Sequence, residues 1–314
     1  MGLKISVVIP TYNRPHDLEN CIQSILDQSV KPNEIIVVDD GDLPGFPLLN
    51  ECKDAGIRCI FHKKNIKKNI RGPAASRNAG VKLSFGEIIF FLDDDVKLFP
   101  DYIEKILNVY ELDKENIIGG VGGFIANHKP LKLVHRLFRL YEIAFLLAGL
   151  REGRVLISGY STDFGTTGNS PRHISKVDFL YGCASSFRKK VFNETSFSEE
   201  YQDYGRSEDK DFSYQVSRKY RLVINPDAKL FHYAAPKIGY NKWKLSRDII
   251  FGKYRFFKNN IKKGWWSWIF FYYALSGYIL KRIIMMIFSF DMSEVYRVKG
   301  ILSALRDALS GKID

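Results

Sequence analysis

The chain has 314 residues and a formal net charge of +12, with 46% hydrophobic and 26% charged residues. This balance is typical of globular proteins and excludes long disordered, collagen-like and disulfide-scaffold classes. At ~150 residues per domain, the length indicates about two units, or one large α/β domain with an appendage. A basic surplus usually indicates an anionic partner, which can be nucleic acid, an acidic membrane surface or a phosphate-bearing substrate.

The basic surplus lies almost entirely in the last part of the chain. Residues 1–228 carry 31 basic and 30 acidic side chains, a net of +1, whereas residues 229–314 carry 16 and 5, a net of +11. The same C-terminal segment holds all four tryptophans and 19 of the 44 aromatic residues. The body is therefore electrically neutral, and the tail is basic and aromatic.

Cysteine spacing and the N-terminal residues indicate a reducing compartment. The cysteines form no C-x-x-C pair and no zinc-ligand spacing, and they are Cys21, Cys52, Cys59 and Cys183. We expect free thiols. The first apolar run, residues 5–9, ends at Pro10 and is too short for a signal-peptide core, so it indicates a buried strand. We expect the protein to act on the cytosolic side.

The first 120 residues alternate apolar runs with helical patterns. Strands are expected at 5–9, 35–38, 59–61 and 87–92, and helices at 17–28, 74–83 and 101–112. Continuous apolar strands separated by helices predict a parallel sheet covered on both faces. Ligands of such sheets bind beyond the carboxyl ends of the strands, so polar residues at those ends are candidates for a site. They are Thr11-Tyr12-Asn13, Asp39-Asp40 and Asp93-Asp94-Asp95.

The periodic signal weakens after residue 117. We expect a strand at 117–123, an apolar helix at 131–150 and a long loop at 151–176. Residues 177–187 and 221–225 bracket a segment rich in carboxylates, and the apolar run 228–231 indicates a further strand.

The triplet Asp93-Asp94-Asp95 is the strongest local signal. Adjacent carboxylates at a strand end repel one another, and a hard cation such as Mg²⁺ or Mn²⁺ would neutralise them. The alternative is a solvated acidic turn before the next helix, where Asp is favourable in any case. From these three residues alone, both interpretations stay open.

Two further motifs have functional and purely structural interpretations. Glu208-Asp209 could supply a base that accepts the proton of an attacking hydroxyl, or could simply begin a helix capped by Ser207. His232 follows an apolar strand, and a lone histidine in that position is usually structural.

Taken together, the motifs resemble glycosyltransferase family 2, the inverting sugar-nucleotide transferases of the GT-A fold. Each piece is weak by itself, but their shared order is specific, and the similarity covers residues 4–232. The pieces are Val8-Ile9-Pro10-Thr11-Tyr12-Asn13-Arg14, Ser24-Ile25-Leu26-Asp27-Gln28, Ile36-Val37-Val38-Asp39-Asp40-Gly41, Ala75-Ser76-Arg77-Asn78-Ala79-Gly80, Phe91-Leu92-Asp93-Asp94-Asp95, Gly182-Cys183-Ala184-Ser185-Ser186-Phe187-Arg188, Glu208-Asp209 and Asn225-Pro226-Asp227-Ala228 before His232.

The resemblance implies a GT-A mixed sheet flanked by helices and a site for a nucleoside-diphosphate sugar, with a UDP-sugar favoured. Arg77 would lie near the diphosphate, and Asp40 would hydrogen-bond the base with Asp39 nearby. The full set of expected donor-binding residues is Pro10, Thr11, Tyr12, Asn13, Asp39, Asp40, Arg77, Asp93 and Asp94. The chain departs from the family's pattern at Asp42, where a serine or threonine is usual.

The resemblance also implies the catalytic and metal-binding residues. Asp209 matches the catalytic base and Glu208 its partner. Asp95, Asp93 and His232 match ligands of a Mn²⁺ or Mg²⁺ ion, with Asp95 as the first choice. The metal and Arg77 would neutralise charge on the leaving nucleoside diphosphate while the acceptor hydroxyl attacks the opposite face of the sugar.

The tail combines a basic run at 253–263 with a nearly apolar, aromatic segment at 265–290. Only 16 residues of this segment precede the charge pair Lys281-Arg282, whereas a span takes ~20 apolar residues. An interrupted aromatic segment beside basic residues favours an in-plane anchor on an anionic membrane. The alternatives are a soluble helical layer on the catalytic domain and nucleic-acid binding, for which the chain has no recognisable module.

We therefore expect an inverting, metal-dependent glycosyltransferase at the cytoplasmic side of the membrane, acting on a glycan or polyprenyl-linked acceptor. The alternatives are a sugar-phosphate nucleotidyltransferase and a catalytically silent, membrane-docked binding protein. The expected domains are a catalytic domain at 1–235, divided into a nucleotide-sugar half at 1–118 and an acceptor-side half at 119–235, and a helical membrane-associating region at 236–314.

Overall fold

The chain forms two compact units in the computed structural model. The first comprises Met1–Lys129, Pro171–Tyr204 and Glu208–Ala235, and the second Pro130–Ser170, Gly205–Ser207 and Pro236–Asp314. The structure describes residues 2–65, 71–127, 133–166, 171–202, 206–234, 241–289, 291 and 293–310. The domain limits expected from the sequence stay a prediction.

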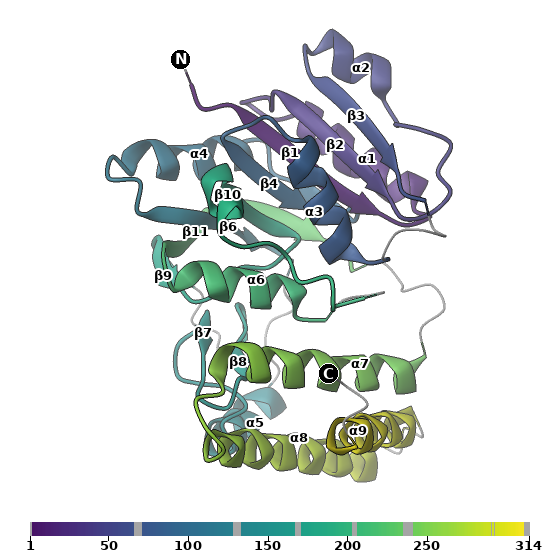
Figure 1. Ribbon diagram of the computed structural model, residues 1–314, viewed down its shortest axis with the longest axis vertical. Coiled ribbons are helices and arrows are strands. Elements are labelled where there is room, and N and C mark those ends of the chain that lie inside the picture. Colours follow the sequence, from purple (N-terminus) through teal and green to yellow (C-terminus); the bar gives the residue numbers. More distant parts are fainter. Residues whose placement is uncertain are drawn as a thin grey trace. The chain divides into compact units, whose positions relative to one another are not determined.

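The first unit is built on a mixed sheet, nine-stranded within the described residues (Figure 1). Its strands are β1 (Ile5–Thr11), β2 (Glu34–Asp39), β3 (Arg58–Lys63), β4 (Ile88–Leu92), β5 (Val96–Leu98), β6 (Ile118–Ile125), β9 (Ser175–Val177), β10 (Ala184–Arg188) and β11 (Arg221–His232). They are ordered β3-β2-β1-β4-β10-β6-β11-β5, and β9 pairs with β11. Strands β1 to β4 are parallel, as expected, whereas β10 runs antiparallel to β4 and β6 and makes the sheet mixed.

Helices cover both faces of this sheet, because successive side chains of each buried strand point to opposite sides. Ile5, Val7 and Ile9 of β1 belong to a core formed with α1 (Pro15–Leu26) and α4 (Tyr102–Leu112). On the other side, Phe91 of β4 packs edge-on against Phe197, with ring centroids 5.2 Å apart. The helices on that side are α3 (Pro73–Leu83), which packs on β1 and β2, and α6 (Glu208–Ser217), which packs on β6 and β11.

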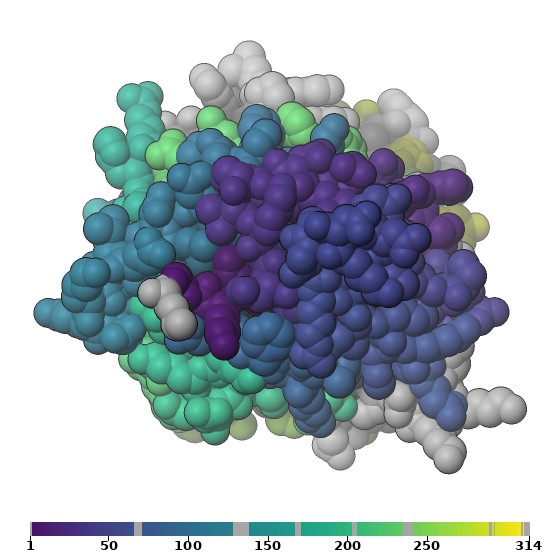
Figure 2. All heavy atoms as spheres, turned by 90° about the horizontal axis from the view of Figure 1, so that it is seen from above, coloured from purple at the N-terminus to yellow at the C-terminus, as the bar shows by residue number. Residues whose placement is uncertain are grey.

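The expected N-terminal helices and strands are confirmed with small shifts at their ends. Two short elements were not expected, α2 (Leu49–Asp54) and β5, because neither is long enough to show a period. The purple-to-blue N-terminal part of the chain forms most of the face seen in Figure 2.

The segment 131–176 differs from its prediction. The expected helix is α5 (Leu133–Ala144) and ends early, because Leu146 adopts a left-handed φ of 53° and the Leu147 N–H folds back to the Glu142 carbonyl. Residues 131 and 132 lie outside the described residues. The expected loop contains the paired strands β7 (Arg154–Val155) and β8 (Ser161–Thr162), which are too short to leave a pattern.

The second unit contains the helices of the aromatic tail. They are α7 (Lys242–Phe256), continued by a π-helical turn at Phe257–Ile261, then α8 (Ser267–Ser289) and α9 (Ser293–Leu309). Their buried cluster consists of Ile250, Phe257, Phe271, Leu275, Ile301 and Ala304.

Helix α8 is continuous across the charge pair that was expected to interrupt it. Lys281 Nζ lies 2.6 Å from the Glu142 carboxylate of α5, and Arg282 Nη1 lies 3.5 Å from that of Glu294 in α9. Each charge therefore has a partner of opposite sign within the same unit, which offsets the cost of placing it in an apolar helix.

Gly86 lies against β1 at the entry to β4. Its N–H donates to Ser6 Oγ at 2.8 Å, and the same hydroxyl donates to Glu34 Oε1 at 2.5 Å. A Cβ at position 86 would lie 2.6 Å from the backbone nitrogen of Ser6, which cannot rotate away. Only glycine fits there.

We expect Gly86→Ala to lower the free energy of unfolding by about 1–3 kcal/mol through overpacking. The matched control is Gly45→Ala, because a Cβ at Gly45 meets no atom within 4 Å, and it should change stability by less than about 0.5 kcal/mol. Urea unfolding followed by circular dichroism measures both. Equal urea midpoints of unfolding for the two variants would show that the close approach at Gly86 does not contribute to stability.

Candidate active site

The carboxyl ends of the parallel strands gather the polar residues, as expected. Thr11 at the end of β1 pairs in register with Asp39 at the end of β2, and the aspartate triplet follows β4 on the other side of β1. Thr11 Oγ1 donates to Asp94 Oδ2 at 2.8 Å, which links two of these strand ends directly.

Asp39 holds the loop that follows β2. Its side chain is fully buried, Oδ1 accepts from the Gly41 N–H at 2.8 Å, and Oδ2 accepts from the Leu43 N–H at 2.9 Å. Because both carboxylate oxygens accept from the loop, Asp39 shapes the wall of the site.

Asp40 joins this loop to α3. Its Oδ1 lies 2.5 Å from Lys64 Nζ, and its Oδ2 accepts from the Gly72 N–H at 2.8 Å and from Ser76 Oγ at 3.1 Å. The side chains of Asp40 and Lys64 are both buried, so the pair is a fixed polar element at the edge of the site.

Pro10 lies within β1, opposite Val38 of β2, and Tyr12 and Asn13 directly follow the strand. Asn13 Oδ1 accepts from the Asp42 N–H at 2.9 Å, which ties the residue that departs from the family's pattern to the start of the site. The guanidinium of Arg71 lies over the Tyr12 ring at 5.0 Å. Arg71 is not among the donor-binding residues expected from the sequence, because a charged loop of this kind is more often solvated than a phosphate clamp.

Asp94 is buried between Thr11 and Arg14, whose Nη1 lies 3.1 Å from Asp94 Oδ1. Burial, reinforced by the neighbouring carboxylates of Asp95 and Asp93, raises the pKa of Asp94 to about 7, although Arg14 and Thr11 oppose the shift. The middle aspartate of the triplet is thus held on the β1 side of the site.

Arg77 connects the two halves of the site. Its Nη2 donates to Asp93 Oδ1 at 3.0 Å and its Nη1 to Glu208 Oε1 at 2.9 Å, and its side chain is 2% exposed. Gly182 makes room for it, because a Cβ there would lie 2.5 Å from Arg77 Nη2. Asp93 and Glu208, which are far apart in the chain, are therefore held through one guanidinium.

Glu208 and Asp209 begin α6 but lie in different surroundings. Glu208 is buried, and burial together with the Asp209 charge raises its pKa to about 7 against the opposing effect of Arg77. Asp209 is half-buried, and its Oδ2 accepts from the Gly182 N–H at 2.9 Å. Glu208 is therefore the internal member of the pair, and Asp209 is the more exposed one.

His232 ends β11, where it pairs with Val96 and so comes to lie beside the aspartate triplet. Its Nε2 lies 3.1 Å from Asp95 Oδ1. Burial lowers the pKa of His232, but the Asp95 hydrogen bond and the charges of the triplet outweigh it and raise the pKa above its ordinary value.

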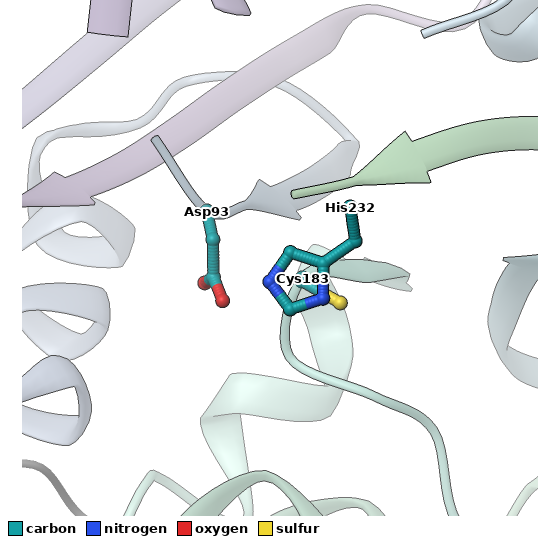
Figure 3. A group of neighbouring side chains, drawn as sticks. All are labelled: Asp93, Cys183 and His232. Atoms are coloured by element: carbon teal, nitrogen blue, oxygen red, sulfur yellow. The ribbon is translucent and has the colours of Figure 1, made fainter. Parts of the chain in front are cut away.

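These residues have the chemistry of a divalent-cation site. Asp93, Asp95 and His232 offer carboxylate oxygen and imidazole nitrogen, the donors that suit Mn²⁺ and that Mg²⁺ accepts in part. Figure 3 shows the side chains of Asp93 and His232 pointing toward one another, with Cys183 beside the imidazole. The donor set fits the ion that the family resemblance implies.

Comparison with known proteins identifies the family of the chain. The glycosyl transferase family 2 model matches residues 6–195. An uncharacterized glycosyltransferase of Rickettsia felis is 43% identical over 110 residues, which are 34% of this chain and 17% of the relative. The glucosyl-dolichyl phosphate glucuronosyltransferase of Haloferax volcanii is 27% identical over 194 residues, which are 61% of this chain and 55% of the relative. The chain thus spans about a sixth of the first of these proteins and about half of the second.

A solved structure reproduces the fold. The mannosyltransferase PcManGT of Pyrobaculum calidifontis, in complex with GDP-Man and Mn²⁺, superimposes with a TM-score of 0.57 at 15% identity, covering 98% of this chain and 88% of that one. The GT-A fold expected from the sequence is confirmed. Because the family model covers well over half of its residues, the chain belongs to glycosyl transferase family 2.

Proposed function

We propose that the chain is a metal-dependent inverting glycosyltransferase that moves a sugar from a nucleoside-diphosphate sugar to an acceptor hydroxyl. The observation that carries the proposal is the bridge made by Arg77 between Asp93, on the donor side, and Glu208, beside Asp209. Asp93 belongs to the carboxylates that would bind the donor and its metal, and Asp209 is the carboxylate that would take the acceptor's proton. The bridge keeps these two groups close to each other.

We assign the donor nucleotide to the carboxyl ends of β1, β2 and β4. A UDP-sugar is favoured by the family resemblance, with the base beside Tyr12 and Arg71, whose stacked pair offers a flat face to a ring. The expected diphosphate contact of Arg77 stays a prediction, and in this structure its terminal nitrogens are engaged by Asp93 and Glu208.

Asp93, Asp95 and His232 would hold Mn²⁺ or Mg²⁺. A divalent ion bound there neutralises the charge that grows on the leaving diphosphate. Asp209 accepts the proton of the acceptor hydroxyl as its oxygen attacks the anomeric carbon, and the bond from that carbon to the diphosphate oxygen breaks. Attack from the face opposite the leaving group inverts the anomeric configuration.

We expect Asp209→Asn to lower turnover by about 10²–10⁴-fold while donor binding stays unchanged, because the variant loses a base and no donor contact. The release of nucleoside diphosphate measures turnover, and calorimetry measures donor affinity. Asp54→Asn, an exposed substitution in α2, is the control and should keep full activity. Near-normal turnover of Asp209→Asn would overturn the assignment, and release of pyrophosphate would indicate a nucleotidyltransferase instead.

Glu208 supports Asp209 by positioning, and its titration should be visible in stability. Raising its pKa from 4.5 to about 7 means that the folded state holds the proton more tightly. The corresponding stabilisation is fully present below pH 4.5 and is lost as the pH rises through about 7. At 1.36 kcal/mol per pH unit it amounts to about 3 kcal/mol.

We therefore expect the unfolding free energy of the wild type to fall relative to that of Glu208→Gln between pH 4.5 and 8. Thermal unfolding of both proteins without added metal, across this range, measures the difference. Parallel curves would show that Glu208 titrates in the folded protein as it does in the unfolded chain.

We also propose that the second unit docks on an anionic membrane at the cytoplasmic side, where the acceptor would be a glycan or a polyprenyl-linked sugar. One side of α8 packs into the unit through Phe271 and Leu275, and the other side is exposed, with Trp265 just before the helix 80% exposed and Ile269 62%. By length and composition alone, Ser267–Phe288 could also cross a membrane. Because one side of α8 packs against other helices of the unit, we favour a position in which the helix lies in the plane of the membrane surface.

The Haloferax volcanii relative, named for a dolichyl phosphate acceptor, supports a lipid-linked acceptor for this chain. The exposed lysines 258, 262 and 263 beside the aromatic residues match an anionic surface, at roughly 1 kcal/mol each near the lipid.

We expect the double variant Trp265→Ser/Ile269→Ser to lower partitioning onto anionic liposomes by about tenfold or more, since each side chain contributes about 1.5–3 kcal/mol when buried. Flotation of the full chain measures partitioning. The control Leu112→Ser removes an equally exposed apolar side chain, 78% exposed, from the first unit and should float like the wild type. Unchanged flotation of the double variant would favour a soluble helical layer.

A further inference from the structure

Strand register brings a cysteine to the metal site. Strand β10 runs antiparallel to β4 with Ala184 opposite Leu92, so that Cys183 and Asp93, the next residues outward, stand side by side. His232 reaches the same place from β11. Cys183 is the turn residue that directly precedes β10 and Asp93 directly follows β4, so the pairing of Ala184 with Leu92 places both beside the end of the paired strands.

The three side chains form a compact group of mixed chemistry. The Asp93 carboxylate oxygen, the Cys183 sulfur and a His232 ring nitrogen all lie within 4.8 Å of one another, and Figure 3 shows them converging from three strands' ends. Ligands of a tetrahedral zinc ion lie about 2.0–2.3 Å from the metal and so about 3.5 Å from one another. Small side-chain rotations would bring the three ligand atoms from their present separations, of up to 4.8 Å, to this spacing.

The ligand set differs from one made for Mn²⁺ or Mg²⁺ alone. Those ions favour oxygen donors, whereas thiolate selects softer ions such as Zn²⁺. One sulfur, one imidazole nitrogen and one carboxylate oxygen make a three-ligand zinc site with a fourth position open for water or a phosphate oxygen.

We propose that Cys183 adds a thiolate ligand to the metal site, so that Zn²⁺ binds through Asp93, Cys183 and His232 and competes with Mn²⁺. The thiol proton leaves to solvent as the zinc–sulfur bond forms. The competition rests on the proposed function, in which Asp93 and His232 hold the activating ion, but soft-ion binding itself can be measured without any transfer reaction.

Co²⁺ is the probe, because it takes zinc sites and shows a thiolate-to-cobalt charge-transfer band when sulfur is a ligand. We expect the full-length wild type with Co²⁺ alone to show this band, Cys183→Ser to lack it, and added Zn²⁺ to abolish it. We further expect Zn²⁺ to inhibit Mn²⁺-supported transfer at concentrations at least tenfold lower in the wild type than in Cys183→Ser, with each rate scaled to its own uninhibited value.

Cys59→Ser is the matched control, because Cys59 and Cys52 lie beside each other and are the other place where two thiols could attract a soft ion. It should keep the band, and circular dichroism should show that both variants are folded. The proposal is overturned if the wild type shows no sulfur band, or if the band survives Cys183→Ser and disappears in Cys59→Ser. Either result leaves the Mn²⁺-dependent transfer reaction untouched, so the two proposals fail separately.

Discussion

The site depends on one buried guanidinium. Arg77 is 2% exposed and lies between Asp93 and Glu208, at 3.0 and 2.9 Å. A buried charge is costly without partners, so each carboxylate stabilises the arginine while the arginine fixes the positions of both. The carboxyl end of β4 and the first turn of α6 are thereby held together, and a side chain at Gly182 would collide with the guanidinium.

The mixed topology provides the remaining geometry. Parallel strands alone would gather Thr11, Asp39 and Asp93 at one edge, as doubly wound sheets do. The insertion of β10 beside β4 brings Cys183 to this edge from the opposite chain direction. Strand β11 is parallel to β6 and therefore runs in the direction of β4, and its carboxyl end brings His232 to the same edge beside β5. A site that combines carboxylates, imidazole and thiol follows from this mixture of parallel and antiparallel pairings.

Much of this arrangement is predictable from the sequence. Apolar runs of four to six residues ended by polar residues predict the central strands and the strand-end positions of Asp39 and Asp93. Long-range pairings leave no local pattern, so neither the hydrogen bonds of Arg77 nor the stacking of Arg71 on Tyr12 could be predicted. The charge pair of the tail was interpreted as an interruption, because partners such as Glu142, 139 residues from Lys281, become visible only in the fold.

The central claim is inverting transfer from a nucleoside-diphosphate sugar. The most direct measurement incubates the full-length protein with Mn²⁺, a panel of nucleotide sugars and hydroxyl acceptors, and then determines the anomeric configuration of the product by proton NMR. We predict release of nucleoside diphosphate and a glycosidic bond of the configuration opposite to that of the donor. A product with retained configuration, or pyrophosphate as the released group, would contradict the account.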